Sequence, residues 1–216
     1  MFKRFKLFFV IFLITISCQD KSEDNQKYYG KIENGIYYND FFEFSVELQD
    51  DMTVIHGLEL KELLNINAQE NIEDYKKLEK ELKRNEQKVK ELIALYKNPF
   101  DSYGFNPNVI IIAENIKEFD SNIKNGRDFL GYSRFAMENI NPNLETLVGF
   151  DKRKIGGRQF WELNAFLQTE FGEIQQSYYA TIIKDYSLLI IVSYLESTDK
   201  LLLEKAIDKL KFRELK

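Results

Sequence analysis

Residues 147–195 read LVGFDKRKIGGRQFWELNAFLQTEFGEIQQSYYATIIKDYSLLIIVSYL, and this stretch decides the fold. Its apolar and aromatic runs are interrupted by short turn sequences, namely Gly156-Gly157, Phe171-Gly172 and Lys184-Asp185-Tyr186. The pattern predicts strands at residues 147–155, 158–168, 174–183 and 187–195. Because the turns between successive strands are short, we expect an antiparallel meander.

Helices are predicted on both sides of this meander. Downstream, Ser197 or Thr198 can cap a final helix that runs to Leu210. Upstream, residues 126–140 predict another helix, and a strand at 108–116 precedes it. The run VIIIA at 109–113 within that strand is too apolar for a sheet edge. We therefore expect it in the middle of a sheet that is covered on both faces.

The early part of the chain predicts further strands. Residues 36–38 form the first, and 52–55 can add a third after the turn Gln49-Asp50-Asp51. Between them, residues 41–48 alternate apolar and polar side chains, the period-two pattern of a half-buried strand. Strand runs separated from helices predict an α+β fold, an antiparallel β-sheet with helices packed on its faces.

Residues 58–97 contain neither Gly nor Pro and are rich in Glu and Lys. We predict a long, charged amphipathic helix over this segment, stopped by Asn98-Pro99. With Asn85 included, its apolar seam repeats at steps of three and four through Tyr75, Leu78, Leu82, Val89, Leu92 and Tyr96. Two interpretations stay open: the seam covers the sheet, or it offers a partner-binding face as a groove-binding or coiled-coil helix.

The N-terminus has the pattern of an export signal. Three cations (Lys3, Arg4 and Lys6) precede an apolar run at 7–14 that is too short to span a bilayer. Thr15-Ile16-Ser17 then lead to Cys18, which is the only cysteine of the chain. The alternative is an ordinary signal peptide or a short membrane anchor, with Cys18 incidental.

Residues 15–18 resemble the lipobox of bacterial lipoproteins, although Thr15 stands where Leu is usual. The resemblance implies a signal peptide at 1–17, cleavage between Ser17 and Cys18, and a diacylglyceryl thioether on Cys18. The lipid would anchor the protein to a bacterial membrane in the cell envelope, at the outer membrane or the cell surface. Residues 18–29 are then a flexible acidic tether, and residues 30–216 form a single domain.

Several stretches of that domain also resemble the Mog1/PsbP-like fold: residues 38–46 (YNDFFEFSV), 107–111 (PNVII) and the closing meander at 154–191. The long helix of 58–97 is a departure from this fold. Members of the family are mostly small lipoproteins or accessory proteins that bind other proteins, and few are enzymes. The resemblance therefore implies a binding role.

Composition excludes several other functions. The chain has 216 residues and a formal net charge of −5, which becomes −8 once the three cations of residues 1–17 are removed. Such a balance argues against nucleic-acid binding. The single histidine, His56, has no partners for a catalytic triad or a histidine-based zinc site, so we expect no enzyme, metal or cofactor. Gly156-Gly157 lacks the pattern of a phosphate-binding loop.

The sequence therefore predicts a membrane-anchored envelope lipoprotein that binds a partner protein as a non-enzymatic accessory or assembly module. A first alternative is a lipoprotein that binds a small ligand or glycan in a cleft between the sheet and the long helix. A second is an envelope hydrolase that uses two carboxylates.

Overall fold

The computed structural model describes residues 27–70, 89–100, 102–117 and 122–213, without the side chains of residues 64–70 and 140. Its strands are β1 (Lys31–Glu33), β2 (Ile36–Asn39), β3 (Phe44–Glu47), β4 (Thr53–His56), β5 (Val89–Tyr96), β6 (Asn108–Asn115), β7 (Leu144–Thr146), β8 (Asp151–Ile155), β9 (Arg158–Thr169), β10 (Gly172–Ile183), β11 (Tyr186–Tyr194) and β12 (Leu210–Phe212). Three helices lie within these residues: α2 (Gly57–Glu70), α4 (Gly126–Ile140) and α5 (Ser197–Asp208).

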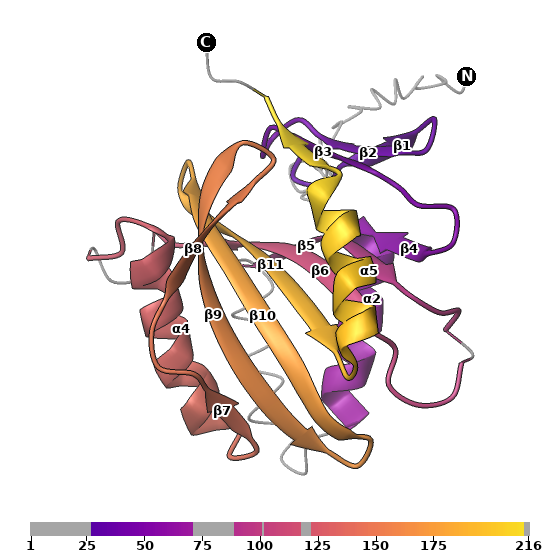
Figure 1. Ribbon diagram of the computed structural model, residues 1–216. Helices are drawn as coiled ribbons and strands as arrows, with labels where there is room; N and C mark the ends of the chain where they lie inside the picture. Colours follow the sequence, from indigo (N-terminus) through magenta and orange to yellow (C-terminus); the bar gives the residue numbers. More distant parts are fainter. Residues whose placement is uncertain (1–26, 71–88, 101, 118–121, 214–216) are drawn as a thin grey trace, which may run out of the picture.

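The strands form two antiparallel sheets (Figure 1). The large sheet has the order β4-β5-β6-β11-β10-β9-β7, and β8 also pairs with β9. The small sheet has the order β1-β2-β3-β12, so it joins the beginning of the described chain to its end. The prediction of an α+β fold with antiparallel sheets and packed helices is confirmed.

Both faces of the large sheet are covered. Leu188 and Leu189 are neighbours on β11 and point to opposite sides, and each belongs to a different hydrophobic cluster. The cluster around Leu188 includes α5 and the inward side chains of the small sheet, whereas the cluster around Leu189 includes Phe129 and Leu130 of α4. A further cluster joins Leu60 of α2 to β4 and β5. The molecule is thus layered around one central sheet.

The turns of the meander and the central strand were predicted correctly, but the first strand of the meander begins at Asp151 and not at residue 147. Strands β8 to β11 follow one another in antiparallel pairs, and the turn at Gly156-Gly157 joins β8 to β9. Strand β6 lies between β5 and β11, in the middle of the sheet. Helix α4 has the predicted bounds because the Asn125 side chain caps it, accepting hydrogen bonds from the backbone N–H groups of Arg127 and Asp128.

The final helix differs from the prediction at both ends. Its N-cap is Glu196, whose side chain makes no capping hydrogen bond, so neither Ser197 nor Thr198 is the cap. The helix ends at Asp208, because Leu210 already belongs to β12 and pairs with Val46 of β3.

The predicted long helix at 58–97 is wrong in its last part. Helix α2 accounts for its beginning, and residues 71–88 lie outside the described part of the chain. From Val89 to Tyr96 the chain is strand β5, with β4 on one side and β6 on the other. Leu92 to Tyr96 are all buried, which removes the apolar-polar alternation of a half-buried strand. A buried strand of this kind cannot be told from a helix by periodicity alone.

Candidate binding site on the small sheet

The small sheet has one buried face and one exposed face, and the sequence of its strands explains why. Phe44 and Val46 of β3 are buried against the large sheet, as is Leu210 of β12. The residues between them point the other way. Ser45 pairs in register with Tyr38 of β2 and with Lys211 of β12, so Tyr38, Ser45 and Lys211 form one row across three strands.

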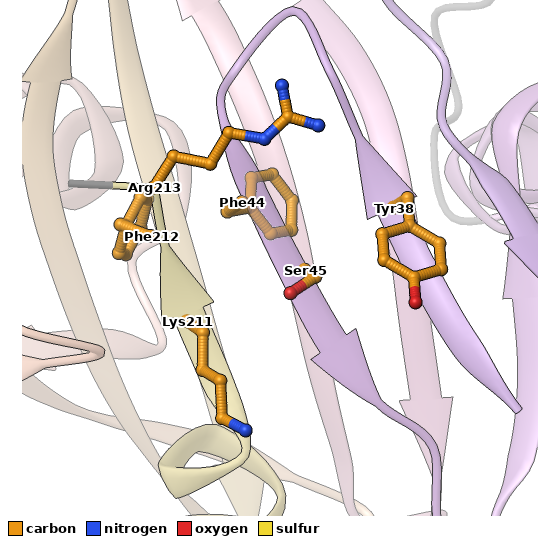
Figure 2. Close-up of a pocket in the computed structure, with 6 residues that line it drawn as sticks. All are labelled: Tyr38, Phe44, Ser45, Lys211, Phe212 and Arg213. Carbon is orange, nitrogen blue, oxygen red and sulfur yellow. The ribbon is translucent and has the colours of Figure 1, made fainter. Parts of the chain in front are cut away.

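A cavity of about 230 Å³ opens beside this row (Figure 2). It is lined by Tyr38, Phe44, Ser45, Lys211, Phe212 and Arg213. Pockets for drug-sized ligands usually have volumes of roughly 300–1,000 Å³. The cavity is therefore suited to a single side chain or a comparably small group.

Aromatic packing on the inner face holds β3 and β12 against the large sheet. The ring centroids of Phe44 and Phe212 lie 6.0 Å apart, and Phe160 of β9 lies 5.8 Å from Phe212. The guanidinium group of Arg158 stands 5.3 Å from the centre of the Phe212 ring, a cation–π contact that keeps a positive charge near the cavity. These ring contacts thus join the inner face of the small sheet to the large sheet.

The exposed face of the small sheet carries several ion pairs, in which every carboxylate has a basic partner. These pairs are Lys31–Glu33, Lys209–Glu47 and Arg213–Asp40. The hydrogen bond from Lys209 lowers the pKa of Glu47, and the hydrogen bond to Glu33 raises the pKa of Lys31. Lys211 makes no ion pair with a carboxylate of the described residues, but its positive charge also contributes to the lowered pKa of Glu47.

The turn between β8 and β9 covers the free edge of β12. The N–H group of Phe212 donates to the carbonyl oxygen of Gly156 at 3.4 Å. Gly156 has a φ of +54°, and a Cβ atom there would stand 2.6 Å from the carbonyl oxygen of Leu210. Only glycine fits this approach. A partner strand therefore cannot add to this edge, and the site offers side chains instead.

The residues predicted for lipidation and cleavage, Cys18 and Ser17, lie outside the described part of the chain, as do Tyr75, Leu78 and Leu82. The remaining members of the predicted partner-binding face are not on a helix. Val89 is half-buried in β5, while Leu92 and Tyr96 are buried in it. These three residues pack within the large sheet, so they do not form a helical partner-binding face.

The sequence did not identify the basic end of the site. The predicted last helix ran to Leu210, and nothing was assigned to Lys211, Phe212 and Arg213. The signal was present, because residues 210–213 alternate apolar and basic side chains as a half-buried strand does. Three residues are, however, too few for the pattern to compete with the helix before them.

The other residues considered from the sequence lie elsewhere. His56 ends β4 and its ring stands 6.0 Å from that of Tyr37, so it does not line the cavity. Of the adjacent tyrosines on β2, Tyr37 is buried and Tyr38 is half-buried. Tyr178 and Tyr179 of β10 are both buried, because both faces of the large sheet are covered there.

Within the described residues, no group of three His, Cys, Asp or Glu side chains could hold a metal ion. No helix in the same part of the chain is long and apolar enough to cross a membrane. Glu138 accepts hydrogen bonds from Thr146 and Arg134, which lower its pKa. A general acid would need a raised pKa instead.

No protein-family model and no curated protein matches the sequence. Among solved structures, the chain is similar to the cyanobacterial PsbP protein (CyanoP) of Synechocystis, with 12% identity and a TM-score of 0.48 over 82% of this chain and 91% of that chain. It is also similar to LpqN of Mycobacterium tuberculosis, a protein involved in cell envelope biogenesis, with 13% identity and a TM-score of 0.40 over 57% and 72% of the two chains.

A third similar structure is PA94 of Pseudomonas aeruginosa, a protein of unknown function, with 13% identity and a TM-score of 0.43 over 56% of this chain and 83% of that chain. These similarities are all distant. The chain is an α+β protein with two antiparallel sheets, and its assignment to the Mog1/PsbP-like fold stays a prediction.

Proposed function

We propose that this chain is a non-enzymatic binding module of the bacterial cell envelope, anchored by a lipid on Cys18, which engages a partner protein through the exposed face of its small sheet. The cavity beside Tyr38, Ser45 and Lys211 carries the proposal. It has the size of one side chain, and the basic residues Lys211 and Arg213 are among those that line it. Interfaces between proteins commonly place such an anchor in a small, well-packed pocket.

The point where the chain enters the domain supports a partner within the envelope. Tyr28 packs against Phe41, with ring centroids 4.7 Å apart, and its carbonyl oxygen accepts a hydrogen bond from Asn39 of β2 at 2.9 Å. Nine residues separate Tyr28 from Cys18. At a fully extended length of about 3.3–3.6 Å per residue, a lipid on Cys18 keeps Tyr28 within roughly 36 Å of the bilayer.

The anchor is tested by the intact mass of the protein purified from its native membrane. We expect the mass of a chain that is cleaved before Cys18 and carries added acyl chains. The variant Cys18→Ala should be released from membranes. An unmodified, uncleaved chain would contradict the lipid anchor.

The partner surface is tested separately by site-specific photo-crosslinking in native membranes. A photoreactive residue at position 38 faces the cavity, and one at position 170, in the exposed turn between β9 and β10, is the matched control. We expect one dominant protein adduct from position 38 and none of the same mass from position 170. Equal adduct patterns from both positions, or no protein adduct from position 38, would contradict the proposed function.

A further inference from the structure

We propose that an apolar patch on α4 and on the segment between β7 and β8 rests in the headgroup region of the bilayer that holds the lipid anchor. The patch consists of Tyr132, Phe135, Leu147 and Val148, which are all exposed. This inference rests on the lipid anchor of the proposed function and adds a second membrane contact, made by the folded domain. The small sheet stays accessible to a partner protein, because it lies across the large sheet from α4.

The segment between β7 and β8 lies along α4 (Figure 1). At its beginning, Thr146 donates a hydrogen bond to the Glu138 carboxylate of the helix. At its end, the ring of Phe150 would be 3.9 Å from a Cβ atom at Gly131 of the helix. Seven helical residues rise about 10 Å, and four residues of extended chain span up to about 13 Å. The segment therefore runs antiparallel to α4, against its middle turns.

The most exposed side chains of the patch come from these two neighbouring elements. Val148 lies midway between the two contacts and hence beside the turn of α4 that contains Phe135. Val148 is 92% exposed and Phe135 is 74% exposed. Tyr132 precedes Phe135 by three residues, so both lie on one side of the helix. Apolar side chains that gather at the surface in this way mark a contact with a protein or with a membrane.

The residues beside the patch favour a bilayer. The guanidinium group of Arg127 stands 5.8 Å from the ring centres of both Phe150 and Trp161, and the ammonium group of Lys152 stands 4.7 Å from that of Trp161. Tryptophan and tyrosine are enriched at the headgroup level of membranes, where one end of the ring is apolar and the other wet. Arginine and lysine can lay their apolar stems over such rings and extend their charges to lipid phosphates.

The tether is long enough to let the patch and the lipid reach the same bilayer. Tyr28 packs on the side of the large sheet opposite α4. With the outer side of α4 on the bilayer, the helix adds about 10–12 Å of height, and the layer beyond the large sheet adds about 10 Å. Tyr28 then stands roughly 20 Å above the bilayer, within the reach of roughly 36 Å that the extended tether allows.

A fluorescent label at position 148 tests this contact in the lipidated full-length protein. Cys18 is the only cysteine, and its lipid blocks the thiol, so Val148→Cys and the control Leu201→Cys each take one nitrobenzoxadiazole label. Leu201 is exposed on α5, on the other side of the large sheet. In liposomes of phosphatidylethanolamine and phosphatidylglycerol, a spin-labelled lipid should quench the label at position 148 roughly threefold more than the label at position 201. Equal quenching would overturn the inference.

A second substitution tests whether the patch inserts as one surface. Phe135→Ser should lower the quenching at position 148 roughly twofold, because it removes apolar area next to the label. The fold should persist, since Phe135 is largely exposed. Unchanged quenching would contradict insertion of the patch.

Two further outcomes separate this inference from the alternatives. A label at position 148 that is shielded in native membranes but is not quenched in the liposomes would assign the patch to a protein and overturn the bilayer contact. An intact mass without acyl chains would contradict the lipid anchor of the proposed function. A lipidated chain without quenching at position 148 would overturn this inference alone.

Discussion

The two sheets of this protein differ in what covers them. The large sheet lies between α5 and the small sheet on one side and α2 and α4 on the other, so its central strands are buried on both faces. The small sheet is buried on its inner face only, through Tyr37, Phe44 and Val46. Its outer face keeps polar and basic side chains in contact with solvent.

This difference separates stability from binding. Side chains of the central strands have no freedom to change without disturbing a packed neighbour. The outer face of the small sheet carries Tyr38, Ser45 and Lys211 on a backbone that the large sheet holds in place. Substitutions there should change recognition while the fold persists, and the predictions that follow test this contrast from the largest expected effect to the smallest.

Alkaline pH should produce the largest effect, because it charges tyrosines buried between the layers. Burial raises the pKa of Tyr37, Tyr178 and Tyr179 to about 12, from an ordinary value of 10.0. Between these pH values the unfolded chain loses protons that the folded protein keeps, so stability is complete below pH 10 and falls as the pH rises toward 12. Each tyrosine lowers the free energy of unfolding by about 1.4 kcal/mol per pH unit.

Urea denaturation at a series of pH values, with tyrosinate absorbance recorded in parallel, measures this loss. Burial also raises the pKa of Tyr96 and Tyr186, so Tyr37→Phe should reduce the slope by the contribution of one tyrosine among five. A free energy of unfolding that stays constant from pH 10 to 11 would contradict the burial of these hydroxyl groups.

Truncation in the large sheet should be the next largest effect. Leu188 of β11 is fully buried in the cluster that includes α5. Leu188→Ala should lower the free energy of unfolding by about 2–5 kcal/mol, through lost burial and the cavity that remains. The same change at Leu201, which is 62% exposed on α5, should stay within about 0.5 kcal/mol. Equal urea midpoints for the two variants would refute the two-sided packing of the sheet.

Disturbing the contact between the Gly156 turn and β12 should have an intermediate effect on the free energy of unfolding. Gly156→Ala places a Cβ atom 2.6 Å from the Leu210 carbonyl oxygen at a φ of +54°. We expect a loss of about 2–3 kcal/mol, because the turn must move away from β12. Gly157→Ala has a φ of +87° and no atom within 4 Å, so backbone strain alone should cost about 1 kcal/mol. If thermal denaturation shows the two variants to be equally stable, the turn does not cover β12.

The smallest effect on stability should come from the binding site itself. Lys211 is exposed and has no ion-pair partner among the residues that the structure describes, so Lys211→Gln should change the free energy of unfolding by less than about 0.5 kcal/mol. The variant should have the same melting temperature as the wild type but give much less of the crosslinked product with its partner. A large loss of stability would show that this side chain belongs to the fold.

Elements with a clear local signal could be predicted from the sequence. The meander was predicted because Gly156-Gly157 and Lys184-Asp185 mark its turns, and α4 because apolar residues such as Phe129, Leu130 and Met137 recur along it. The strand at Val89–Tyr96 was taken for a helix because it is buried on both sides and carries a bulge between Glu91 and Ile93. Both features obscure the period of two on which strand prediction depends.

The candidate site could not be predicted because it depends on long-range pairing. Tyr38 and Ser45 are close in sequence, but Lys211 joins them only through the pairing of β12 with β3. Nothing local to residues 210–213 indicates which strand they will meet. The ion pairs on this face likewise depend on where distant segments lie, as with Arg213 and Asp40.

Lysine acetylation of the protein in its native membrane, compared with the purified full-length protein in detergent, tests the central claim most directly. Lys211 reports on the outer face of the small sheet, and Lys205 on the exposed side of α5. We predict that Lys211 reacts several-fold more slowly in the membrane than after purification, while Lys205 reacts equally in both. Equal reactivity of Lys211 in the two preparations would contradict a partner bound to this face.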